Sequence, residues 1–169
     1  MTVAELDRAP DPEVRDALVA CCGARPWVEL MLAARPWGNE AALLACADRC
    51  WGTLTHEQVA EAVAHHPRLG ETRAAATLST RASQWSALEQ SGTRAADDDV
   101  RAELAQGNRD YEVRFGHTFI LCASGLSAAE MLAALRARLG NDPATELRIT
   151  ALELHKITRL RLAKLLASA

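Results

Sequence analysis

The sequence predicts an all-α protein, a compact bundle of several helices in a single domain. Alanine, leucine, arginine and glutamate, which are strong helix formers, dominate, while aromatic residues make up only 4% of the 169 residues. Capping residues, prolines and glycines also divide the chain into segments of helical length. With 49% hydrophobic residues, the chain is long enough for one core. We therefore expect residues 1–169 to form one helical domain.

Caps mark the helices of the first half. Asp11 and Pro12 fit the N-cap and first position of a helix, and Asn39 fits the N-cap of a later one. Thr55 and Gln58 have the spacing of a capping box, in which each side chain bonds the other residue's main-chain N–H. The expected helices cover residues 12–22, 27–34, 40–51 and 56–64.

Capping residues also mark the helices of the second half. The acids at 97–99 suit the positive end of a helix dipole, and Ser127 with Glu130 forms another capping box. The stretch HTFILCASG, residues 117–125, is strand-like but too short and solitary to build a sheet. The expected helices cover residues 83–90, 100–115, 129–139 and 142–166.

Charge and apolar patterning argue against several classes of protein. Nineteen basic and twenty-two acidic residues give a net charge of -3, so no basic field would attract nucleic acid. The N-terminus shows no targeting pattern, and no apolar run reaches the roughly 18 residues that a membrane span needs. We expect neither a nucleic-acid partner nor a membrane association.

Cysteine usage predicts a reducing, cytoplasmic location. The odd number of cysteines, all inside apolar stretches, favours reduced thiols that act as small hydrophobic residues. Cys46 and Cys50 lie one helical turn apart, but no further ligand pair accompanies them, so core packing is favoured over a metal. The five are Cys21, Cys22, Cys46, Cys50 and Cys122.

The sequence HHPRLGE, residues 65–71, is the first candidate for chemistry. Pro67 disfavours helical geometry at His66, so the preceding helix must end there. A histidine beside a proline has a restricted backbone, which aims its imidazole and suits acid–base catalysis. The alternative is structural: His65 ends a helix, where a partly protonated ring favours the dipole, and His66 begins a turn.

A second candidate group is Ser86, Glu89 and Gln90, whose spacing puts them on one helical face. A hydroxyl, a carboxylate and an amide would then point the same way. A solvated surface face explains the pattern equally well.

Arg161 is the third candidate. It falls on an apolar stripe of the last expected helix, formed by Leu147, Leu154, Ile157 and Leu165. A buried guanidinium requires a partner, which would be Glu89, another acid or a bound anion. The alternative is an arginine whose stem lies on the core while its head reaches water.

Four segments in this order resemble the OHCU decarboxylase family, and the resemblance runs from CCGARPW through the last helix. Enzymes of this family convert 2-oxo-4-hydroxy-4-carboxy-5-ureidoimidazoline (OHCU) into (S)-allantoin at the end of urate oxidation. The resemblance implies an all-α fold, a small-molecule substrate, no cofactor, no metal and a homodimer. The segments are HHPRLGE, SALEQ, NRDYEVRFGHTFILCASG with the SAAEML that follows, and ELHKITRLRLAKLL.

The resemblance also assigns roles. It implies that His66, Glu89 and Arg161 are catalytic, with Arg161 and main-chain amides orienting the substrate ring. His66 and Glu89 would bond its hydroxyl and carboxylate, and one of them would deliver a proton. The resemblance places the substrate-binding groups at Pro67, Ser86, Gln90, Phe119, Ile120, Leu121, Cys122 and Ala123.

One departure leaves alternatives open. Leu126 stands where many family members have arginine or lysine, so a cation near the pocket is missing unless Arg68 or Arg73 replaces it. This motivates a related ureido or heterocyclic acid as substrate. The other alternative is a non-catalytic helical interaction module. A metal site at His56, His65 and His66 is disfavoured, because adjacent histidines cannot easily face one ion.

Overall fold

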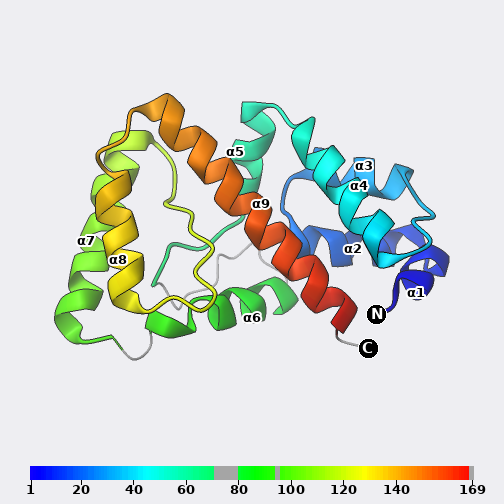
Figure 1. The fold of residues 1–169 in the computed structure, drawn as a ribbon, viewed down its shortest axis with the longest axis horizontal. Helices are drawn as coiled ribbons and strands as arrows, with labels where there is room; N and C mark the ends of the chain where they lie inside the picture. Colours follow the sequence, from blue (N-terminus) through cyan, green and yellow to red (C-terminus); the bar gives the residue numbers. More distant parts are fainter. Residues whose placement is uncertain (71–79, 94–95, 168–169) are drawn as a thin grey trace. The chain divides into compact units, whose positions relative to one another are not determined.

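All regular structure that the computed structural model describes, over residues 1–70, 80–93 and 96–167, is helical (Figure 1). This confirms the all-α prediction. The helices pack as two compact units, residues 1–62 with 155–169 and residues 63–154. That the whole chain is one domain stays a prediction. The elements are α1 (Val3–Arg8), α2 (Asp11–Cys21), α3 (Arg25–Ala33), α4 (Glu40–Gly52), α5 (His56–Ala64), α6 (Thr80–Glu89), the 3-10 turn η1 (Ser91–Thr93), α7 (Asp98–Phe115), α8 (Ala128–Arg138) and α9 (Pro143–Ala167).

Most of the expected caps are present. The Asn39 side chain accepts a hydrogen bond from the Ala42 N–H at 2.9 Å and begins α4. The Thr55 N–H donates to the Gln58 side chain at 2.9 Å at the start of α5. Ser127 forms both bonds of its capping box before α8. These short-range patterns therefore fixed where their helices begin.

Two features at the N-terminus differ from expectation. Asp11 is not an N-cap: α2 begins at Asp11 itself, Pro10 takes the cap position, and the Asp11 carboxylate pairs with Arg35 at 2.8 Å. Helix α1 was not expected from the sequence, although Thr2 and Glu5 form a capping box there. The spacing of Thr2 and Glu5 that defines this box is present in the sequence.

The first unit has its core among α2, α3, α4 and the end of α9. Leu18, Trp27 and Leu43 are fully buried there. The indole N–H of Trp27 donates to the Ala47 carbonyl at 3.2 Å, which joins α3 to α4. The chain's amino group donates to the Leu165 carbonyl at 3.1 Å, so the N-terminus is held against α9.

The second unit has its core between α7 and α8. Its buried cluster includes Tyr111, Phe119 and Leu135, and it also takes in Leu69 from the segment after α5. At Gly107 a Cβ atom would lie 2.6 Å from the Leu135 side chain, so α7 and α8 approach closely there. The cluster therefore anchors the residues that follow the histidine pair.

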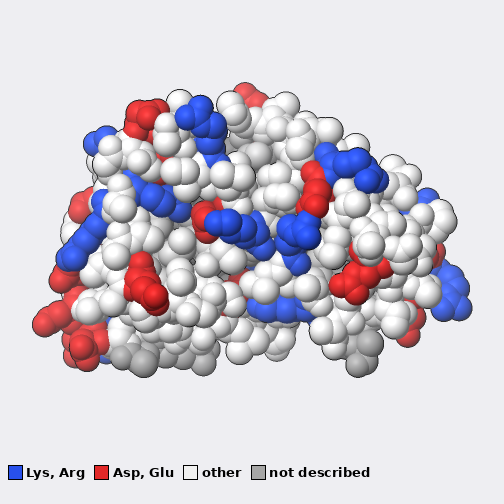
Figure 2. Space-filling model, viewed as in Figure 1, with Lys and Arg blue, Asp and Glu red and all other residues white. Residues whose placement is uncertain are grey.

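The state of the cysteines, the hydropathy of the helices and the surface charge are the remaining features of the fold. All five cysteines lie in the described part of the chain, and none forms a disulfide. None of the described helices is long and apolar enough for a membrane span. Figure 2 shows acidic and basic side chains interspersed on the face in view, in keeping with the small net charge of -3.

Candidate active site

The corner after α5 is fixed by long-range contacts. The helix ends at Ala64, and the His66 N–H donates to the Val63 carbonyl at 3.0 Å. Gly70 has a φ of 84°, which favours glycine, and its N–H donates to the Gln90 side-chain oxygen at 2.7 Å. The corner that carries the half-buried His66 is thus tied to the end of α6.

The second anchor of the corner comes from α7. The Asn108 carboxamide donates to the Leu69 carbonyl at 2.8 Å. The Arg68 guanidinium donates to both oxygens of Glu112, at 2.6 and 2.7 Å. Bidentate pairs of this kind have a well-defined geometry. Because Arg68 is engaged with Glu112, it is not a simple replacement for a cation at position 126; Arg73 lies outside the described residues.

The polar face of α6 is turned into the protein. Ser86 is 5% exposed and Glu89 is 7% exposed, so the alternative of a solvated face is wrong for these two residues. Gln90 is half-buried, and its side-chain oxygen is used on Gly70. Its Nε2 group is therefore what remains to donate to a ligand. A buried carboxylate is costly, which favours a functional interpretation of Glu89.

Arg161 is buried on α9. Its side chain is 3% exposed, so the alternative of a head group in water is wrong, and its Nη1 donates to the Ala20 carbonyl at 3.4 Å. Burial raises the pKa of the neighbouring Cys22 thiol to about 11, against the opposing effect of the Arg161 charge. Arg161 belongs to the first unit, whereas His66 and Glu89 belong to the second. Their convergence on one cavity stays a prediction.

The apolar stripe expected around Arg161 is only partly correct. Leu154, Ile157 and Leu165 are buried, but Leu147 is only half-buried. The buried positions of the first half of α9 are instead polar: Glu146, Thr150 and Glu153. They have helical spacing, so the sequence contained the signal, but an acid is not normally assigned to a core.

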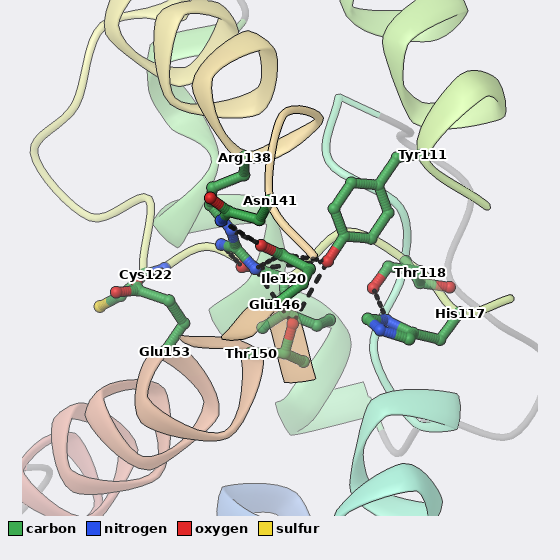
Figure 3. A network of polar contacts seen from close by, with 10 residues as sticks. All are labelled: Tyr111, His117, Thr118, Ile120, Cys122, Arg138, Asn141, Glu146, Thr150 and Glu153. Atoms are coloured by element: carbon green, nitrogen blue, oxygen red, sulfur yellow. Dashed lines mark hydrogen bonds and ion pairs between the residues drawn. The ribbon is translucent and has the colours of Figure 1, made fainter. Parts of the chain in front are cut away.

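Residues 119–123 carry the main chain that the resemblance assigns to the substrate. Phe119, Ile120 and Ala123 are buried, while Leu121 and Cys122 are half-buried. No strand forms over the described residues, in keeping with the expectation that this stretch builds no sheet. Side chains bond the main chain instead, at Ile120 and Cys122 (Figure 3).

A buried network that the sequence did not reveal lies beside this segment (Figure 3). Arg138 donates from Nε and Nη2 to Glu146 at 2.8 and 2.5 Å, and from Nη2 to Thr150 at 3.0 Å. The Tyr111 hydroxyl donates to Glu146, and Asn141 donates to its other oxygen at 2.8 Å. Three helices thus contribute to one polar centre.

The network sets the charge of its members. Burial alone raises the pKa of Glu146, but hydrogen bonds from Arg138, Tyr111 and Asn141 outweigh it and hold that pKa below its ordinary value. Burial and the bond to Glu146 raise the pKa of Tyr111. At neutral pH the centre therefore contains a guanidinium, a carboxylate and a neutral phenol.

The remaining candidates have structural explanations. Leu126 is half-buried against the core cluster of the second unit, and a Cβ at Gly92 would lie 2.0 Å from its carbonyl oxygen.

The sulfurs of Cys46 and Cys50 lie 3.8 Å apart in the first unit. Burial, and after it the neighbouring Cys46, raises the pKa of Cys50 to about 11. Among the residues described, no cluster of three or more histidine, cysteine or acidic side chains could hold a metal ion.

Solved structures share this helical fold. A structure described as OHCU decarboxylase in the presence of (S)-allantoin has a TM-score of 0.76 and 34% identity, over 90% of this chain and 98% of that chain. A structure of (S)-allantoin synthase has a TM-score of 0.71, but at 21% identity it supports the fold alone. The fold is therefore that of small all-helical enzymes.

Sequence comparisons identify the family to which this helical protein belongs. Residues 7–163 match the OHCU decarboxylase family, and the chain belongs to that family. The uric acid degradation bifunctional protein TTL of Arabidopsis thaliana is 34% identical over 150 residues, 89% of this chain. The OHCU decarboxylase of Amia calva is 33% identical over 131 residues, covering 76% of this chain and 73% of that protein. This chain spans 46% of the length of the plant protein.

Proposed function

We propose that this chain catalyses the decarboxylation of OHCU to (S)-allantoin in urate degradation. The observation that carries the proposal is membership of the family over residues 7–163. The likeness to an OHCU decarboxylase crystallised in the presence of (S)-allantoin, over 98% of that chain, supports the same reaction.

The chemistry needs positioning and electrostatics more than a cofactor. The bond from C4 to the carboxylate breaks, CO₂ leaves, and the electron pair moves into the adjacent C=N unit, whose nitrogen takes a proton. C5 then takes a proton while the C4 hydroxyl loses one and becomes the carbonyl of allantoin. Delivery of the C5 proton to one face of the ring gives the S configuration.

The proposal assigns these tasks to residues on different elements. His66 and Glu89 bond the C4 hydroxyl and the carboxylate, and one of them delivers the proton. Arg161 holds the anionic substrate, as a guanidinium with 3% exposure suits a desolvated anion. The remaining contacts are assigned to Pro67, Ser86, Gln90 and the main chain of Phe119, Ile120, Leu121, Cys122 and Ala123.

Assembly and location belong to the same proposal and rest on the family resemblance and on cysteine usage. We propose a homodimer of one-domain subunits in the cytoplasm. Sedimentation velocity at micromolar concentration tests the dimer, and a species with the mass of one chain would contradict it.

The experiment uses OHCU generated in place from urate by urate oxidase and the hydrolase that precedes this step. Circular dichroism follows the appearance of (S)-allantoin. His66→Ala and Glu89→Gln should each slow its formation by about a hundredfold or more, while the far-ultraviolet spectrum stays helical. His65→Ala is the matched control, because it removes the neighbouring imidazole and should leave the rate within about threefold.

Two outcomes would contradict different parts of the proposal. Near-native rates in both His66→Ala and Glu89→Gln would overturn the catalytic assignment. A wild-type rate no faster than spontaneous decay would overturn the function and favour a non-catalytic helical module. Because Leu126 replaces a frequent cation, rates with other ureido acids measured in parallel would expose a shifted substrate.

A further inference from the structure

Residues 119–123 have no regular secondary structure, yet charged side chains hold their main chain at two points (Figure 3). The Ile120 carbonyl accepts a hydrogen bond from Arg138 Nη1 at 2.5 Å. The Cys122 N–H donates to Glu153 Oε2 at 2.8 Å. Hydrogen bonds to charged groups are about twice as strong as neutral ones. Arg138 at the end of α8 and Glu153 on α9 therefore restrain this segment from two helices.

Both side chains are themselves restrained. Arg138 is 7% exposed, its other nitrogens bond Glu146 and Thr150, and its guanidinium lies 4.6 Å from the centre of the Phe119 ring. Glu153 is 8% exposed. The Arg138 head cannot shift without breaking these buried interactions, and burial limits the room that the Glu153 carboxylate has to move, so the positions of the bound main-chain groups are set in advance.

Leu121 lies between the two restrained residues. No hydrogen bond joins its main-chain N–H or C=O to any part of the chain that the structure describes. Backbone polar groups in a folded protein find a partner, in water or in a ligand where the protein supplies none. Leu121 is only half-buried, so one donor and one acceptor are left for such a partner.

We propose that Arg138 and Glu153 are positioning residues, which hold Ile120 and Cys122 so that the main chain of Leu121 binds the amide and ureido groups of the substrate. The inference rests on the proposed function. A ring amide offers one N–H and one C=O, which complement those of Leu121. This contact exists before and during the reaction, so its loss raises KM more than it lowers kcat.

The test compares substitutions at Glu153. Glu153→Leu removes the acceptor for the Cys122 N–H, whereas Glu153→Gln keeps a carbonyl oxygen at the same length. Glu153→Leu should raise KM roughly tenfold, the size of effect that a lost hydrogen bond carries, with a smaller change in kcat. Glu153→Gln should restore KM to within about threefold of wild type.

Asn39→Ala is the control for a purely structural role. It removes the cap of α4, a hydrogen bond from the Ala42 N–H, and no bond to Arg138 or to residues 119–123. It should lower stability and leave KM unchanged. An equal rise in KM for Asn39→Ala and Glu153→Leu, or for Glu153→Gln and Glu153→Leu, would overturn the inference. A wild-type enzyme that forms no allantoin above the spontaneous rate would instead overturn the proposed function.

A second measurement holds even if Glu153→Leu does not fold. In the ¹H–¹⁵N spectrum of the wild-type chain, added (S)-allantoin should shift the Leu121 amide resonance downfield, as a new hydrogen bond does. The Gly52 amide, at the end of α4, serves as the reference that does not move. Saturating (S)-allantoin with no movement of the Leu121 resonance would contradict the inference.

Discussion

Arg138 neutralises a carboxylate that water cannot reach. Glu146 is 0% exposed, and Arg138 supplies it with bonds from Nε at 2.8 Å and Nη2 at 2.5 Å. Arg138→Met keeps an unbranched stem but leaves the Glu146 charge with only neutral donors. Breaking a buried pair by removing one partner costs about 3–5 kcal/mol, and we expect that loss in the free energy of unfolding at pH 7.

The pKa of Glu146 determines how the stability loss in Arg138→Met depends on pH. In the wild type the pKa of Glu146 is below its ordinary value, so its contribution is present above that ordinary value and is lost as the pH falls through the lowered pKa. Without Arg138 only the neutral donors Tyr111 and Asn141 oppose the effect of burial, so the pKa of Glu146 rises relative to the wild type. As the pH falls, Glu146 becomes protonated in the variant, which removes the cost of burying its unpaired charge. The stability difference between wild type and Arg138→Met should therefore be largest near neutral pH and shrink in acid.

Urea unfolding followed by far-ultraviolet circular dichroism at pH 7 and pH 4.5 measures both quantities. The control is Arg138→Met combined with Glu146→Gln, which removes the buried charge as well. It should recover a large part of the loss at pH 7. A single variant that loses less than about 1 kcal/mol, or a double variant no more stable than the single one, would refute this account of the network.

Two further predictions concern packing and thiol chemistry. Gly92→Ala should lower stability by about 1–3 kcal/mol in thermal unfolding, because its Cβ would meet the Leu126 carbonyl oxygen at 2.0 Å. Gly52→Ala, where nothing lies within 4 Å, should be neutral or slightly stabilising, and equal effects of the two changes would show that the close approach is absent. The raised pKa values of Cys22 and Cys50, about 11 each, should keep both thiols unreactive toward a disulfide reagent at pH 8 until urea unfolds the chain. Rapid labelling of either thiol in the folded protein would disagree with their burial.

Local signals predicted the helices well because the physics of a cap is local. An N-cap needs only an acceptor and a main-chain N–H two or three residues later, so Asn39 and the Ser127–Glu130 box could be identified from spacing alone. The misplaced cap at Asp11 has the same origin. Both Pro10 and Pro12 flank it, and spacing could not decide which begins the helix.

Burial was much less predictable than helical position. The spacing of Ser86 and Glu89 showed that they share a face but not which way the face turns, and the structure buries both. The reverse held on α9, where Leu147 looked like a core residue and is only half-buried, while Glu146 is fully buried. Its partner Arg138 comes from another helix, so the pairing depends on tertiary structure that residue spacing within one helix cannot show.

The burial of the Arg138–Glu146 ion pair also needs an explanation. A buried ion pair contributes little net stability compared with apolar residues of similar size. The cost of burying Arg138 and Glu146 therefore calls for another reason to place charge there. The hydrogen bond from Arg138 to the Ile120 carbonyl offers one, because an apolar side chain could fill the same volume but could not hold a main-chain oxygen in place. On this argument the centre supplies fixed geometry at residues 119–123, and any stability that it adds is secondary.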